Sequence, residues 1–253
     1  MQNAQHESEA AGRLLQIFAV ICVLARLIPG PASALTVEEI TSEKGIKAWL
    51  VEEHSVPLIA IKFAFLGGAS QDPVGKEGLA DMMSDLLTEG AGDLPAAVFK
   101  ERFLRLGARL SAAAGRDAIY GGLEALTARF GPSAELLRLM VTTPRFDAGS
   151  VDQIRAQHLT DLAQAANVPT RIVVNRWYAE AFLGHVYARP VSGTLDSIAR
   201  VTRDDLKRQH SVLFARDFLR VVIVGDIDKS AAATAIDNIF GSIPEKGQIT
   251  PVT

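Results

Sequence analysis

Segments in which apolar and polar residues partly alternate predict the strands of this chain. They contain β-branched and aromatic residues, which favour strand structure. These segments are residues 36–41, 46–53, 57–66, 108–114, 117–126 and 218–224. Gly115 and Arg116 separate two of them and are positioned to form the turn of a hairpin.

Other segments repeat apolar residues every three or four positions, which predicts helices. The helix expected at residues 76–88 has apolar residues at positions 79, 82, 83, 86 and 87. The remaining helices are expected at about residues 95–106, 131–142, 150–165, 169–184, 202–214 and 229–240. Thr202 followed by Asp205 is an N-cap pattern and indicates where one of them begins.

The order of these elements predicts the fold class. Single strands that alternate with single helices would favour a parallel sheet, but here strands come in runs and helices come in runs. Such runs favour an α+β fold with an antiparallel sheet. We therefore expect a mostly antiparallel sheet of about five or six strands.

Composition excludes one class of function. The chain has 253 residues, of which 48% are hydrophobic and 22% charged, and its net charge is −3. This length and composition suffice for one large packed domain. The 26 Lys and Arg residues are scattered along the chain and form no basic cluster, so no nucleic-acid role is expected.

The N-terminal residues predict export. Arg13 precedes the apolar run at 14–24, and Pro-Gly-Pro and Ala-Ser-Ala follow it, which is typical of a signal peptide with cleavage after Ala34. The run is shorter than the about 20 residues of a membrane span. We expect a periplasmic or secreted protein, with an uncleaved membrane anchor as the alternative. Cys22, the only cysteine, lies in this segment, so the mature chain has no thiol for a disulfide or a nucleophile.

Three segments together carry a family resemblance. Residues 75–92 read GKEGLADMMSDLLTEGAG, residues 185–198 read HVYARPVSGTLDSI, and residues 221–226 read VVIVGD. In order and spacing they resemble the insulinase (pitrilysin) family of zinc peptidases, which includes the processing peptidases, over about residues 36–245. The resemblance implies the N-terminal half-domain of a non-zinc member, with helices covering the sheet on one side.

The residues of the family's zinc chemistry are replaced in this chain. In zinc members a His-x-x-Glu-His helix supplies two ligands and the general base, and a later glutamate supplies the third ligand. These leave zinc one open position for water, whose pKa the metal lowers to about 7. The resemblance places Asp81 and Asp85 at the histidine positions, Ser84 at the base position and Asp161 at the distal ligand position. A hydroxyl cannot accept a proton near neutral pH, so no catalytic residue is expected.

Three interpretations of Asp81, Asp85 and Asp161 are open. We favour solvated or helix-paired polar residues in a vacated site, with no metal ligand and no cofactor. An all-carboxylate site for a hard cation such as Ca²⁺ or Mg²⁺ is the second interpretation, because these ions prefer oxygen ligands. A working zinc site is the third, and zinc is expected only if the degenerate-site interpretation is wrong.

Four other side chains have expected roles, and one of them has two alternatives. His158 lies three residues before Asp161 on the same helical face, so it either leans toward the site or is an ordinary, partly exposed histidine, which we favour. His185 is expected to order its loop. Trp177 and Tyr178 lie in an amphipathic helix and are expected in the core.

The resemblance implies a non-catalytic subunit of a two-chain insulinase-type zinc peptidase, which forms one wall of a peptide-binding chamber. Its partner would be a zinc-bearing subunit of the same family, and its substrate a peptide or an unfolded protein. The alternatives are an active periplasmic zinc metalloendopeptidase and a peptide-binding or scaffold module without a peptidase role. The sequence identifies no peptide-binding residues.

The expected domain organisation follows from the same observations. Residues 1–34 are expected to be the signal peptide, residues 35–245 the insulinase-type α+β domain, and residues 246–253 the start of a linker. That linker would lead to a second half-domain that this chain does not contain. In the family, the Arg and Tyr that bind the substrate carbonyl lie in that second half.

Overall fold

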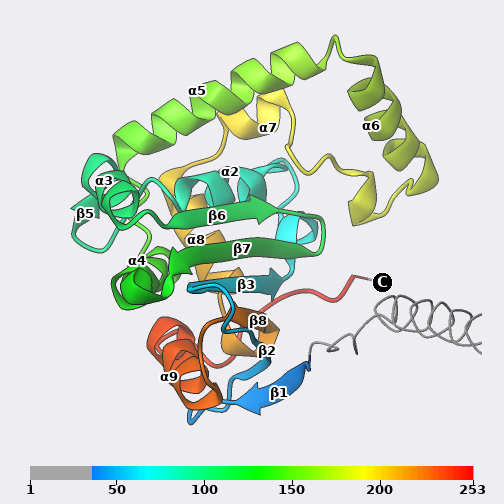
Figure 1. Cartoon of the computed structure of the whole chain (residues 1–253). Helices are drawn as coiled ribbons and strands as arrows, with labels where there is room; N and C mark the ends of the chain where they lie inside the picture. Colours follow the sequence, from blue (N-terminus) through cyan, green and yellow to red (C-terminus); the bar gives the residue numbers. More distant parts are fainter. Residues whose placement is uncertain (1–35, 253) are drawn as a thin grey trace, which may run out of the picture. The chain divides into compact units, whose positions relative to one another are not determined.

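A six-stranded sheet forms the centre of the fold (Figure 1). The computed structural model describes residues 36–252. The strands of the sheet are β1 (Glu38–Thr41), β2 (Lys47–Glu52), β3 (Leu58–Leu66), β6 (Arg109–Ala114), β7 (Ala118–Leu126) and β8 (Leu219–Gly225). Their spatial order is β1-β2-β8-β3-β7-β6. Only the β2–β8 pair is parallel within the described sheet, which confirms the predicted, mostly antiparallel arrangement.

Helices cover one face of this sheet (Figure 1). The helices of the described residues are α2 (Leu79–Leu86), α3 (Ala96–Leu106), α4 (Phe130–Thr142), α5 (Ala148–Ala165), α6 (Pro169–Ala181), α7 (Leu195–Ala199), α8 (Arg203–Leu213) and α9 (Lys229–Phe240). Each predicted helix is present. The five-residue α7 and the two-residue strands β4 (Gly90–Ala91) and β5 (Leu94–Pro95) are too short to leave a periodic pattern in the sequence.

Aromatic side chains join the sheet to the helices. Phe65 of β3 lies 4.3 Å from Phe214, just after α8, and Phe63 lies 5.4 Å from Phe240 of α9, both measured between ring centroids. Gly121 of β7 provides room for Phe63, because a Cβ added there would lie 2.1 Å from the ring. This close packing is the role that Gly121 fills in an otherwise regular strand pair.

Helix α2 begins three residues later than the apolar pattern predicts. Gly78 precedes it in a left-handed conformation, with φ of +89°, which only glycine adopts at little cost. The buried Asp72 carboxylate accepts hydrogen bonds from the N–H groups of Gly78 and Ala80, each at 2.9 Å. A Cβ on Gly193 would lie 2.1 Å from the Glu77 carbonyl oxygen, so the 185–198 loop packs directly against this helix start.

Helix α6 stands away from the sheet (Figure 1). None of its residues is buried, and the side chain of Trp177 is 57% exposed. The prediction of Trp177 as a core residue is therefore wrong, because its amphipathic pattern faces the loop around residues 186–188 instead of the main core. Tyr178 is only partly buried, and the guanidinium of Arg116 lies 3.4 Å above its ring.

The predicted signal peptide or anchor, with Ala34 and Cys22, lies outside the described residues. Residues 246–252 have no regular secondary structure, but Thr250 exchanges two hydrogen bonds with Gln71, at 2.9 and 2.7 Å, and Ile249 packs against the core. Their role as a linker stays a prediction. Across residues 36–252, every helix is too short or too polar to cross a membrane.

Candidate functional site

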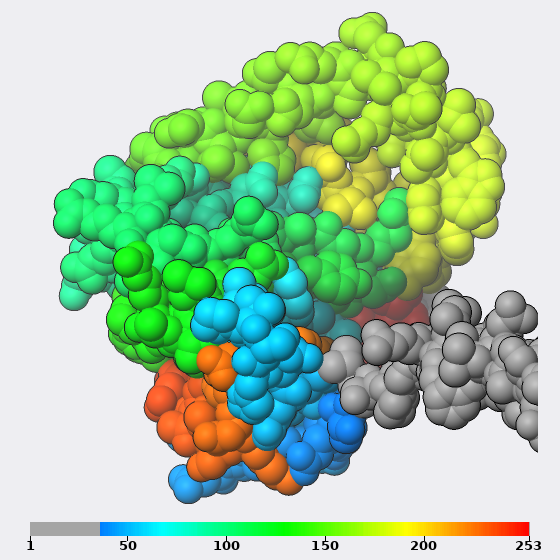
Figure 2. All heavy atoms as spheres, in the orientation of Figure 1, coloured from blue at the N-terminus to red at the C-terminus, as the bar shows by residue number. Residues whose placement is uncertain are grey.

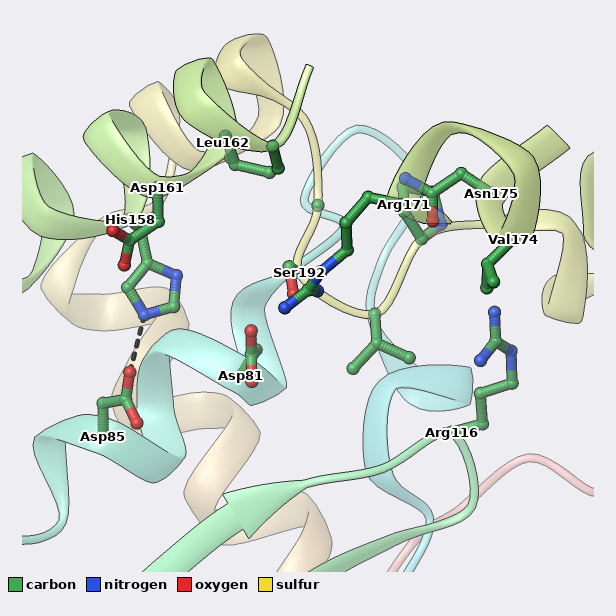
Figure 3. Close-up of a pocket in the computed structure, with 14 residues that line it drawn as sticks. Asp81, Asp85, Arg116, His158, Asp161, Leu162, Arg171, Val174, Asn175 and Ser192 are labelled. Atoms are coloured by element: carbon green, nitrogen blue, oxygen red, sulfur yellow. Dashed lines mark hydrogen bonds and ion pairs between the residues drawn. The ribbon is translucent and has the colours of Figure 1, made fainter. Parts of the chain in front are cut away.

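A cavity of about 340 Å³ lies between α2, α5, α6 and the loop at 190–193 (Figure 3). Figure 2 shows the same side of the molecule hollowed beneath α5 and α6. The cavity contains the side chains of Asp81, Asp85 and Asp161, the three positions that the resemblance assigned to metal ligands. Although Asp161 is 76 positions from Asp85 in the sequence, the fold brings all three carboxylates to one wall.

Ser84 takes no part in this cavity. Its side chain is fully buried, and its hydroxyl donates a 2.8 Å hydrogen bond to the carbonyl oxygen of Asp81 in the preceding turn of α2. A hydroxyl held in this way is engaged with the helix backbone, and Ser84 does not line the cavity. The residue at the general-base position therefore does not reach a ligand in the cavity.

His158 of α5 is part of the site. It is only 7% exposed, and its Nε2 lies 2.8 Å from Oδ2 of Asp85 (Figure 3). This contact raises the pKa of His158, and the nearby carboxylates of Asp81 and Asp161 act in the same direction, while burial opposes them. The favoured expectation of an ordinary, partly exposed histidine is wrong. The sequence could not show that α5 would press this ring onto α2.

The carboxylates have different environments. Burial raises the pKa of Asp81, and the His158 ring opposes that rise. A hydrogen bond with Ser192 and the charge of Arg171 also favour the ionised form of Asp81. Asp161 is exposed at the rim and accepts a 2.9 Å hydrogen bond from Nε2 of Gln157.

The opposite wall of the cavity is cationic. Arg171 and Asn175 project from α6, and Arg116 projects from the β6–β7 turn (Figure 3). The ring of Tyr178 packs against one face of the Arg116 guanidinium. Nε of Arg116 donates a hydrogen bond to the carbonyl oxygen of Tyr187 at 3.5 Å. The sequence did not identify this wall, because it forms only when α6 folds back over the hairpin turn.

The loop at 185–198 holds the cavity's third side. Nδ1 of His185 accepts a 3.1 Å hydrogen bond from the backbone N–H of Tyr187, as expected for a residue that orders the loop. Arg189 donates to the carbonyl oxygens of Asp72 and Ser70, at 2.8 and 3.2 Å. The loop therefore fixes both the entry to α2 and the position of Ser192 in the cavity.

The donor set of this site does not fit zinc. Zinc sites use three or four close protein ligands, mainly imidazole and thiolate groups with at most a carboxylate among them. Here the single imidazole already contacts Asp85 through Nε2, and its raised pKa favours the imidazolium, which cannot bind a metal. Across residues 36–252, no three His, Cys, Asp or Glu side chains converge closely enough to hold one ion. Arg171 and Arg116 in the same cavity also oppose a divalent cation.

No protein-family profile matches the chain. Among curated proteins, it is 26% identical over 228 residues to the non-peptidase homolog YmxG of Helicobacter pylori, covering 90% of this chain and 52% of that protein. It is 23% identical over 226 residues to the zinc protease PqqE of the same species, covering 85% of this chain and 49% of that protein. The chain spans about half the length of these curated relatives.

Solved structures share the fold. An inactive domain of a peptidase of family M16 from Pseudomonas fluorescens superposes with a TM-score of 0.82 at 24% identity, covering 87% of this chain and 53% of that one. A protease from Helicobacter pylori gives a TM-score of 0.77 at 20% identity, with 87% and 53% coverage. The periplasmic protease PqqL of Escherichia coli gives 0.74 at 16% identity, covering 88% of this chain and 26% of that one.

Proposed function

We propose that this chain, an insulinase-type (M16) peptidase half-domain without the zinc motif, belongs to the non-catalytic subunit of a two-chain zinc peptidase. One observation carries the proposal. The frame around α2 is intact, from Asp72 and Gly78 to the 185–198 loop, while the metal positions hold carboxylates and one of them contacts His158. Helix α2 thus keeps its packing but lacks the zinc ligands and the general base. This is what we expect for the wall of a chamber whose catalytic centre lies in another chain.

Hydrolysis by a metallopeptidase needs a metal-bound water and a group that accepts its proton. At the base position, Ser84 is buried and donates its hydroxyl to a backbone carbonyl. At the second ligand position, Asp85 contacts His158. Both features favour the non-catalytic role over an active zinc metalloendopeptidase.

The curated relatives support a two-chain arrangement. Helicobacter pylori has both a relative named as a non-peptidase homolog and a relative named as a zinc protease. A species with both kinds of chain has the two subunits that a heterodimer of one non-catalytic and one zinc-bearing chain requires. We therefore propose a zinc-bearing subunit of the same family as the partner, and a peptide or unfolded protein as the ligand of the chamber.

We also propose a periplasmic location. The residues 14–24 and Ala34 have the sequence pattern of a signal peptide, and a structural neighbour, PqqL, is named a periplasmic protease. Fractionation of cells that produce the tagged protein tests this location. Recovery in the cytoplasmic fraction, with residues 1–34 still attached, would contradict it.

Co-expression with a zinc-bearing relative from the same genome tests the assembly. The proposal predicts that the two proteins purify together and that the pair cleaves an unstructured peptide faster than the zinc-bearing chain alone. Failure to associate, together with no stimulation of cleavage, would contradict the two-chain role and favour a free-standing binding or scaffold module.

A further inference from the structure

We infer that the cavity between α2, α5 and α6 binds a zwitterion, namely an α-amino acid or a dipeptide, with its ammonium group against the aspartates and its carboxylate against the arginines. The inference goes beyond the proposed function, because it concerns the chain alone and holds with or without a zinc-bearing partner.

The acidic and basic side chains of the cavity come from different elements: the aspartates from α2 and α5, the arginines from α6 and the β6–β7 turn (Figure 3). On one side lie the carboxyl groups of Asp81, Asp85 and Asp161, with the imidazole of His158 against Asp85. On the facing wall, Arg116 and Arg171 supply two positive charges. The cavity therefore offers acidic groups on one side and guanidinium groups on the other.

A cavity with acidic and basic side chains on different sides selects among ligand classes. A divalent cation meets the two guanidinium groups, and a simple anion meets the aspartates, so each is repelled by one wall. A purely apolar ligand would remove charged groups from water without giving them partners. A zwitterion satisfies both walls at once, because its ammonium group can pair with the aspartates while its carboxylate group pairs with the arginines.

The size and the remaining lining agree with a small molecule. A volume of about 340 Å³ lies near the lower end of the range of about 300–1,000 Å³ for small-molecule sites. A cavity of this volume suits one or two amino-acid residues. Leu162, Val174 and Val191 line part of the cavity and offer an apolar surface to an aliphatic side chain.

The arginine wall is held in place before any ligand binds. The ring of Tyr178 and the carbonyl oxygen of Tyr187 fix Arg116. Arg171 lies close enough to Asp81 to favour ionisation of that carboxyl, and Figure 3 shows its guanidinium directed toward Asp81 and Ser192. Groups that are already ordered lose less conformational freedom on binding, and a planar guanidinium can bind a carboxylate through two parallel hydrogen bonds.

Isothermal titration of the purified chain tests the inference at neutral pH and low salt. The probes are L-leucine, the dipeptide Ala-Leu, and Ala-Leu blocked as its N-acetyl amide, which has neither end charge. We expect at least one free probe to bind and the blocked dipeptide not to bind. Binding of leucine alone would identify a free amino acid as the ligand, and binding of the dipeptide alone would identify a dipeptide.

Two variants and a control make the test specific. Arg171→Gln and Asp81→Asn should each weaken binding by about tenfold or more, because each removes a charged partner of the ligand. Arg176→Gln is the control, since Arg176 pairs with Glu180 on the same helix at 2.7 Å and does not line the cavity. Equal binding of the blocked dipeptide, unchanged affinity in both variants, or no binding of either free probe at millimolar concentration would overturn the inference.

Discussion

His158 and Asp85 join α5 to α2 through a 2.8 Å contact between Nε2 and Oδ2. By the resemblance, Asp85 occupies a zinc-ligand position on α2, and Asp161 occupies another on α5. In a zinc-bearing relative the metal would link these two helices. In this chain the histidine–carboxylate contact links the same two helices.

Substitution of Asp85 tests this link. Asp85→Asn removes the charged partner of His158 and should lower the free energy of unfolding by about 1 kcal/mol, a modest value because the aspartate is half exposed. Urea denaturation measures the change. Asp152→Asn is the matched control on α5, since Asp152 is 74% exposed and its loss should have little effect. Equal effects of the two substitutions would show that the His158–Asp85 contact does not hold the helices together.

The same contact predicts a dependence on pH. The pKa of His158 is raised in the folded chain above its ordinary value of 6.5, so the folded state holds the proton more tightly than the unfolded state. Its stabilisation is therefore complete below about pH 6.5 and is lost as the pH rises through the raised pKa. Proton NMR titration of the imidazole should show a pKa above 6.5, which falls in Asp85→Asn. A pKa at or below 6.5 in the unaltered chain would contradict the prediction.

His210 should respond to pH in the opposite sense. It stacks on Phe214 at 4.3 Å and its Nε2 lies 3.0 Å from the carbonyl oxygen of Val141. Burial lowers its pKa to about 4, so its contribution to stability is present above about pH 6.5 and is lost as the pH falls toward 4. His210→Phe should be less stable at neutral pH but lose less stability on acidification. Parallel curves of stability against pH for the two proteins would count against this role.

The glycine contact between the loop and α2 should be essential for the frame. Gly193 has φ of +75°, and an added Cβ would lie 2.1 Å from the Glu77 carbonyl oxygen, so Gly193→Ala should destabilise the chain by about 1–3 kcal/mol or more. Gly131→Ala is the control, because that position lies in α4 with nothing within 4 Å of the new methyl group. The control should be neutral or slightly stabilising in thermal unfolding. A Gly193→Ala variant as stable as the control would refute the packing argument.

Helix α6 should open more readily than the helices on the sheet. None of its residues is buried, whereas six of the eight residues of α2 are buried. Segments with few buried contacts open locally at low free energy. Hydrogen exchange should therefore be much faster in residues 169–181 than in 79–86. Similar protection of the two segments would show that α6 is held by contacts other than those described.

The sequence predicted the main elements of the fold because strands and helices here are long and carry regular patterns. It misplaced the start of α2, since the left-handed Gly78 and its bond to Asp72 depend on tertiary structure. It also misassigned Trp177, because an apolar stripe does not reveal which surface it meets.

The site was predictable only in part. The resemblance placed Asp81, Asp85 and Asp161 together, and the fold brings them to one cavity. The contact of His158 and the facing wall with Arg171 arise from how α5 and α6 pack, over sequence distances that no local pattern encodes.

Metal analysis combined with a cleavage assay tests the central claim most directly. The chain should be measured alone and in a complex with a zinc-bearing relative. The account predicts no stoichiometric zinc and no peptide cleavage for the chain alone, and one zinc per complex. It also predicts that chelator-sensitive cleavage survives Asp81→Ala here but is lost when the partner's motif is altered. Stoichiometric zinc with chelator-sensitive cleavage by the chain alone would contradict it.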